Sequence, residues 1–226
     1  ASFALEGVLS YGEIDPVVVR GTDNLEFLSS FNTNLLSGTS YELGGGGFYF
    51  GIDTQDRSTW PTSGFRLLTS GQLLYDLDTE EDTTKYNVIA SAANEIGPVG
   101  VNFRFQAESA EGTGDQPSTI LTLGGFRRIS AFAENSVPNN QYVLAMGEAF
   151  YRLTDTENIV NFPFYVGSTI EYAAADFNVF QEGLTDTIVS GSLYIGGDTA
   201  LGPIYFGTGF SDRGDTSVFL HFGRAF

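Results

Sequence analysis

The chain has 226 residues, 42% of them hydrophobic, which is enough for one domain with a sizeable core. Aspartate and glutamate total 28 against 10 lysines and arginines, and the net charge of −18 disfavours binding to nucleic-acid phosphate, so we expect no nucleic-acid partner. Cysteine is absent and His221 is the single histidine, which excludes disulfide scaffolds, thiolate zinc sites and histidine-rich metal sites. We therefore expect no metal or other cofactor.

Alternation of apolar and polar residues dominates the chain, and helical periodicity is nearly absent. No stretch approaches the roughly 20 apolar residues of a membrane-spanning helix. A membrane-spanning strand needs only about 9–11 residues, with every second one apolar. The pattern predicts an all-β fold, namely a transmembrane antiparallel β-barrel. A soluble β-sandwich or a secreted barrel also alternates and stays open as an alternative.

Twelve strands are predicted, in chain order 1–11, 16–22, 24–33, 40–52, 65–77, 86–94, 98–109, 141–153, 162–174, 188–198, 203–211 and 216–226. The pattern is weakest over the first three, so ten strands is an alternative. An even number places both termini on the periplasmic side of an outer membrane, and the long connection at about 110–140 is then extracellular. No repeat or linker is found, so residues 1–226 are expected to form a single domain.

Strand phase assigns charged side chains to the lumen. In the strand at 98–109, Arg104 and Glu108 alternate with an apolar face that would contact lipid. In the strand at 162–174, the same alternation turns Glu171 inward. These three residues are therefore the candidate lumen partners.

The final strand ends on spaced apolar residues. Leu220, Phe222 and the terminal Phe226 share the lipid-facing side, in the usual form of an outer-membrane assembly signal. His221 is out of phase with them and should face the lumen. The opening Ala-Ser-Phe-Ala is typical of a mature end left by signal-peptide removal, with an expression boundary as the alternative.

Four stretches carry a family resemblance. Residues 123–132, LGGFRRISAF, resemble a pattern LGG-F-x-x-LSG-Y; residues 191–207, GSLYIGGDTALGPIYFG, resemble GSLFLGADTPLGPLYLG; residues 222–226 resemble LGRPF, and residues 60–64 resemble FPTRG. These patterns are similar to the outer-membrane superfamily of BamA-type insertases and two-partner secretion transporters, and most similar to the C-terminal barrel of bacterial patatin-like phospholipases. The family barrel has sixteen strands, so this chain resembles a shortened version without adaptor repeats or a patatin domain.

The resemblance implies that the long loop reaches into the lumen through a motif of Gly124, Gly125, Phe126, Arg127, Arg128, Ser130 and Phe132. In the superfamily a loop arginine pairs with an acid on a later strand. Ser130 occupies that arginine's position here, so we expect Arg127 or Arg128 to pair with Glu171 and hold the loop inside. Two solvent-exposed arginines are the alternative.

Catalytic motifs are lacking. A patatin hydrolase needs a G-x-S-x-G elbow, and none occurs. The stretch from Gly124 to Arg127 has the form of an oxyanion loop but lies in the barrel-family loop. His221 is more readily a polar lumen residue than a catalytic base. We therefore expect no catalytic residue and no enzyme.

The sequence thus favours a non-enzymatic transport or translocation-type pore in a bacterial outer membrane, plugged by loop 110–140. A membrane scaffold or homodimer with a closed lumen is the second reading, and an outer-membrane lipase is a distant third. The expected partners are outer-membrane lipids and lipopolysaccharide, with the barrel-assembly machinery during biogenesis.

Overall fold

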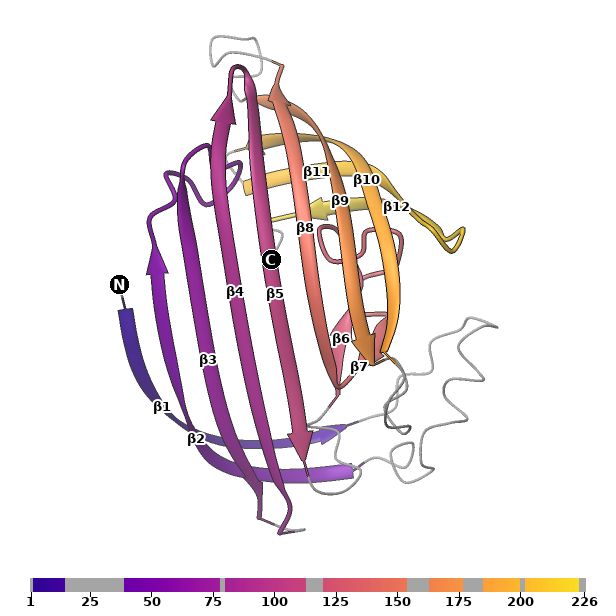
Figure 1. Ribbon diagram of the computed structural model, residues 1–226. Coiled ribbons are helices and arrows are strands. Elements are labelled where there is room, and N and C mark those ends of the chain that lie inside the picture. The colour runs from indigo at the N-terminus through magenta and orange to yellow at the C-terminus, as the bar shows by residue number, and fades with distance from the viewer. Residues whose placement is uncertain are drawn as a thin grey trace.

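The computed structural model describes residues 2–14, 39–77, 80–112, 120–153, 163–176, 185–199 and 202–223 (Figure 1). These residues form an all-β structure whose strands are β1 (Ser2–Ile14), β2 (Thr39–Asp53), β3 (Gly64–Asp76), β4 (Asp82–Ile96), β5 (Val99–Gly112), β6 (Leu121–Leu123), β7 (Val137–Asn139), β8 (Gln141–Arg152), β9 (Phe164–Asp176), β10 (Thr185–Thr199), β11 (Gly202–Ser211) and β12 (Thr216–Phe222). In the described ranges, no helix has the length and apolar character needed to cross a membrane.

Ten strands form one antiparallel sheet in the order β1-β2-β3-β4-β5-β8-β9-β10-β11-β12. Each neighbour in the sheet is the next long strand along the chain, so the sheet is a simple meander. The sheet curves strongly, so that β1 and β2 bend behind it at one edge and β10 to β12 bend behind it at the other (Figure 1). Over the described residues, the edge strands β1 and β12 do not pair with each other.

Among the described residues the large sheet has ten strands, where the sequence predicted twelve with ten as the alternative. Ten predicted ranges coincide with the ten strands of the sheet to within a few residues at each end. The predicted strands at 16–22 and 24–33 lie outside the described residues. Within the described residues, β1 pairs directly with β2 along its full length, from Ser2 with Gly51 to Ile14 with Thr39.

Side chains alternate between the two faces of the sheet. In β8, Tyr142, Leu144, Met146, Glu148 and Phe150 are buried on the concave face. The convex face carries exposed large apolar side chains on β2 to β5 and β8 to β12, among them Phe103, Val143, Ile170, Leu193, Phe206 and Leu220. Glu171 is buried on the concave face, and Leu220 and Phe222 are exposed on the convex face, as the strand phase predicts.

The segment 120–140, which includes the two-stranded sheet of β6 and β7, lies against the concave face (Figure 1). Leu121, Leu123 and Ile129 pack there with Leu144 of β8 and Ile188 of β10. The connection between β5 and β8 therefore supplies much of the core that the curved sheet surrounds.

The connection between β2 and β3 covers a second part of the concave face. Trp60 is fully buried there, with its ring stacked on Tyr165 at a centroid distance of 4.2 Å. Tyr205 lies 4.9 Å from the same indole. Connections from both ends of the sheet thus fill its interior.

Candidate functional site

The tip of the inserted loop is a tight turn with unusual backbone geometry. Gly124 and Gly125 have positive φ of 111° and 101°, and Arg127 and Ile129 have positive φ of 65° and 69°. A β-branched residue such as Ile129 rarely adopts this conformation, which persists only where surrounding contacts fix it. Those contacts are hydrogen bonds within the turn, such as Gly124 N–H to the Arg128 carbonyl, and contacts with the sheet.

Arg127 forms the central ion pair of the interior. Its guanidinium donates to a single oxygen of Glu148 on β8, through Nε at 2.9 Å and through a second nitrogen. The Glu148 carboxylate also accepts from the Tyr194 hydroxyl and from the Asn102 amide. The Arg127 and Glu148 side chains are only 9% and 2% exposed, so the pair is almost fully buried.

Ser130 binds the second buried carboxylate. Its backbone N–H and its hydroxyl each donate to Glu171 on β9 at 2.5 Å, and Thr169 donates a third hydrogen bond at 2.7 Å. Glu171 has no exposed surface. The two acids point inward from adjacent strands, offset by two positions in the register, since Glu148 is opposite Thr169 and Glu171 is opposite Met146. Arg127 and Ser130, three positions apart in the loop, can therefore each bind one of these two acids.

The loop tip also contacts β10, β11 and β12. The Ala131 N–H donates to the Ser190 hydroxyl at 3.1 Å, and Ser217 donates to the Ser130 carbonyl. A Cβ added to Gly209 would lie 2.0 Å from that same carbonyl oxygen. Glycine at position 209 therefore allows the close approach of loop and strand.

Phe126 anchors the turn in an aromatic cluster. Its ring stacks on Phe219 at 4.7 Å and contacts Tyr205 at 4.9 Å and Tyr194 at 5.1 Å. The Arg127 guanidinium lies 5.1 Å from the ring centroids of both Phe126 and Tyr205, within the range of a cation–π interaction.

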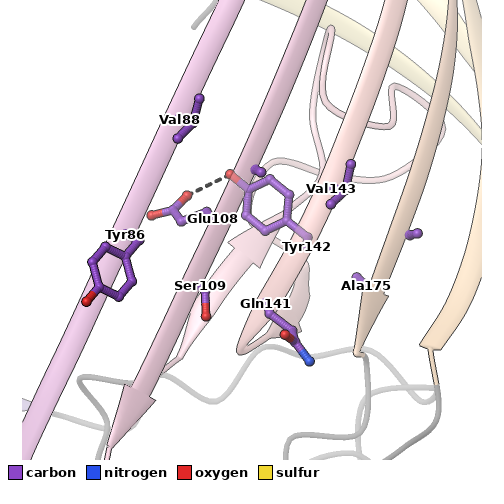
Figure 2. Close-up of a pocket in the computed structure, with 10 residues that line it drawn as sticks. Tyr86, Val88, Glu108, Ser109, Gln141, Tyr142, Val143 and Ala175 are labelled. Carbon is purple, nitrogen blue, oxygen red and sulfur yellow. Dashed lines mark hydrogen bonds between the residues drawn. The ribbon is translucent and has the colours of Figure 1, made fainter. Parts of the chain in front are cut away.

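Arg128 lies on the other side of the turn and connects it to Glu108. Its guanidinium donates to the Thr122 carbonyl and to the Tyr142 hydroxyl at 2.8 and 3.1 Å. The Tyr142 hydroxyl donates in turn to Glu108 at 2.7 Å, as Figure 2 shows.

The convex face of β4, β5, β8 and β9 carries an open pocket of about 380 Å³ around these residues (Figure 2). The side chains around it include Tyr86, Val88 and Val143. Glu108 is the one acidic or basic residue along its lining, and it is engaged with Tyr142.

The structure corrects the predicted partner of the loop arginine and adds a residue that the sequence analysis missed. The predicted pair of Arg127 or Arg128 with Glu171 is wrong in its partner, because Arg127 binds Glu148 and Glu171 binds Ser130. The alternative of two solvent-exposed arginines is wrong as well. Sequence reasoning missed Glu148, although the alternation of β8 marks it as inward-facing in the same way that it marked Glu171.

Of the remaining candidates, Phe132 packs against the core of the inserted loop, and Arg104 lies on β5, opposite Ser91 and Met146. His221 is half-buried, and its Nε2 has no hydrogen-bond partner among the described residues. Its nearest rings are Tyr205 and Phe126, at 6.1 and 6.3 Å. Phe226 lies outside the described residues.

The described residues contain no group of three histidine, cysteine, aspartate or glutamate side chains arranged to hold a metal ion. The polar side chains of the site instead form hydrogen bonds between the inserted loop and the sheet. No model of a known protein family matches this sequence, and no curated protein matches it either. The arrangement of the site is therefore the basis for the functional proposal.

Proposed function

We propose that the chain is an outer-membrane β-barrel protein and a transport or translocation-type pore, plugged by the segment 120–140. The observation that carries the proposal is the apolar convex face, which lies opposite a concave face with buried charges. Soluble monomers rarely expose contiguous apolar surface beyond a few hundred Å². Exposed Ile170, Leu193 and Phe206 on three successive strands fit contact with lipid instead.

Strand length and topology support the same proposal. β3, β4, β5 and β9 have 13, 15, 14 and 13 residues, well above the roughly 5–6 of ordinary globular strands. They exceed the roughly 9–11 residues with which a tilted strand crosses a bilayer. In a meander of ten strands, the edge strands β1 and β12 run in opposite directions. Antiparallel pairing of β1 with β12 would therefore complete a barrel with an even strand number.

The pinned loop supports the assignment as a plug. Two buried carboxylates on the wall hold one turn of the loop through charge-assisted hydrogen bonds, which are stronger than neutral ones. A plug held at its tip by specific polar contacts can be displaced as a unit. This supports a gated pore more than a permanently filled barrel.

The filled interior favours the second candidate, a scaffold or homodimer with a closed lumen. Aromatic side chains from both connections and from β8 to β12 meet there. A lipase has less support, because His221 has no described serine or aspartate as a hydrogen-bond partner.

Conductance in planar lipid bilayers distinguishes the candidates. The protein is refolded into detergent, and a folded barrel is verified by the shift in gel mobility on heating. We expect small or no steps from the wild type and larger discrete steps from a variant in which residues 124–134 are replaced by a short glycine linker. Verified barrels that never conduct, with or without the loop, would contradict the pore and favour the scaffold.

A further inference from the structure

A second polar site lies inside the sheet, next to the Arg127–Glu148 pair that holds the loop tip. It is a pocket of about 250 Å³ between the connection of β2 and β3, the concave face of β3 to β5, and Arg127 of the inserted loop. Three arginines line it, Arg66, Arg104 and Arg127, against the single carboxylate of Glu148. This positive pocket stands out in a chain whose net charge is −18.

Arg104 has no counter-charge. Within the part of the chain that the structure describes, none of the ion pairs includes it. One nitrogen donates to the Gln106 side chain at 3.0 Å, while the buried Nε has no partner. The other two basic side chains of the pocket, Arg66 and Arg127, carry the same charge as Arg104. A guanidinium carries five N–H donors, and leaving a half-buried one unpaired is costly.

The register places a small hydroxyl between two of these arginines. Ser91 on β4 pairs with Arg66 on β3 and with Arg104 on β5, so the three residues form one row on the concave face. Adjacent strands lie about 4.8 Å apart, so the two arginine backbones are roughly 10 Å apart with Ser91 between them. The Ser91 hydroxyl accepts from the Gln55 amide at 3.3 Å, which leaves its own proton free to donate.

The other acids near the pocket are already engaged. Glu148 accepts hydrogen bonds from Arg127, Tyr194 and Asn102. Asp53 lies 3.7 Å from Arg66, and both of these side chains are about half exposed. Neither acid therefore neutralises Arg104.

We propose that Arg104, Arg66 and Ser91 form a binding site for a phosphate-type oxyanion carried by a small soluble molecule. Guanidinium forks match the oxygens of such a group, and a hydroxyl between them adds a third donor. The pocket volume suits a phosphate group with a few further atoms. Because the site lies on the face opposite the apolar surface, its ligand comes from solution and not from a lipid. The proposal does not depend on conduction, so its failure would leave the plugged pore untouched.

Equilibrium dialysis of the refolded, detergent-solubilised protein against radiolabelled inorganic phosphate tests the site. We expect saturable binding of one phosphate per chain that sulfate displaces and that chloride at the same ionic strength does not. Arg104→Gln should lower the association constant about tenfold or more, because a hydrogen-bonded charge is lost. Arg104→Lys keeps the charge but not the forked donors, so its association constant should lie between those of the wild type and Arg104→Gln.

Arg213→Gln is the matched control, since Arg213 is paired with Asp186 near the end of the sheet away from this pocket, and it should bind phosphate as the wild type does. Arg66→Gln provides a second test at a half-exposed position if Arg104→Gln does not refold, and it should weaken binding several-fold. Heat-modifiable gel mobility verifies each folded variant. A folded wild type without saturable phosphate binding, or binding unchanged in the folded arginine variants of the pocket, would overturn the proposal.

Discussion

Arg127 of the inserted loop and Glu148 of β8 form a buried ion pair at the point where the loop turns back. Among the described residues, it is the only ion pair that joins the loop tip to the sheet. Its neighbour Glu171 receives hydrogen bonds from Ser130 instead. Loss of the Glu148 carboxylate leaves a buried charge without a partner, whereas loss of the Glu171 carboxylate removes only hydrogen bonds.

Glu148→Gln should destabilise the folded protein by about 3–5 kcal/mol, because it leaves the Arg127 charge buried without a partner. Urea unfolding in lipid vesicles, followed by the fluorescence of Trp60, measures the change. Asp186→Asn removes the partner of exposed Arg213 and is the control, expected to cost no more than about 1 kcal/mol. Equal effects of the two substitutions would contradict the buried pair.

Gly209→Ala should push the loop tip away from β11, since the added Cβ would lie 2.0 Å from the Ser130 carbonyl oxygen. We expect a destabilisation of about 1–3 kcal/mol, typical of overpacking. Limited proteolysis should then cleave within 120–140 faster than in the wild type. Gly147→Ala is the matched control, because its Cβ meets only Ile170 at an ordinary 3.5 Å. Unchanged cleavage in Gly209→Ala would mean that the tip does not rest on β11.

Leu193→Lys should cost about 2–4 kcal/mol in a bilayer, since Leu193 is exposed near the middle of β10 on the apolar face. Ile96→Lys is the control. Ile96 is also exposed, but it is the last residue of β4, where the expected cost is at most about 1 kcal/mol. Refolding yield and urea unfolding in vesicles report both values. A smaller cost at Leu193 than at Ile96 would contradict the proposed contact of this face with lipid.

Asp56 should make the connection between β2 and β3 sensitive to acid. Burial raises the pKa of its carboxyl, but hydrogen bonds from the Ser63 and Thr62 backbone amides and the Thr62 hydroxyl outweigh this effect and hold the pKa below its ordinary value of 3.8. A lowered pKa stabilises the fold at pH values above the unfolded pKa, and the stabilisation is lost as the pH falls through the folded pKa.

Trp60 lies in the same connection and is the only tryptophan, so its fluorescence reports on this region. We expect a change in emission in strongly acidic solution, below the ordinary pKa of an aspartate. Asp56→Asn should abolish that transition. A transition that persists in Asp56→Asn would assign it to another group.

Alternation of side chains was enough to predict the long strands and their inward residues. Glu171, Arg104 and Glu108 were placed on the concave face because each is one position out of phase with apolar neighbours. The same rule marks Glu148, which was missed because no family pattern drew attention to it. The alternation was weakest over the first three predicted strands, and two of these, at 16–22 and 24–33, lie outside the described residues.

The partner of Arg127 could not be predicted in this way. Which acid the guanidinium reaches depends on the register of β8 against β9 and on the path of the loop tip. That path is set by the positive φ at Gly124, Gly125, Arg127 and Ile129 and by the space above Gly209. Both are properties of tertiary structure, and periodicity along the chain carries no information about them.

The most direct test of the central claim is whether residues 120–140 lie inside the folded sheet. The natural sequence has no cysteine, so Ala131→Cys with Ser190→Cys provides a thiol pair without background, at positions where the Ala131 N–H contacts the Ser190 hydroxyl. After refolding into vesicles, oxidation should link the two cysteines in the heat-modifiable folded species, while a pairing of Ala131→Cys with Ile96→Cys should stay unlinked. A folded barrel in which Ala131→Cys and Ser190→Cys never form the disulfide would contradict a loop held inside the protein.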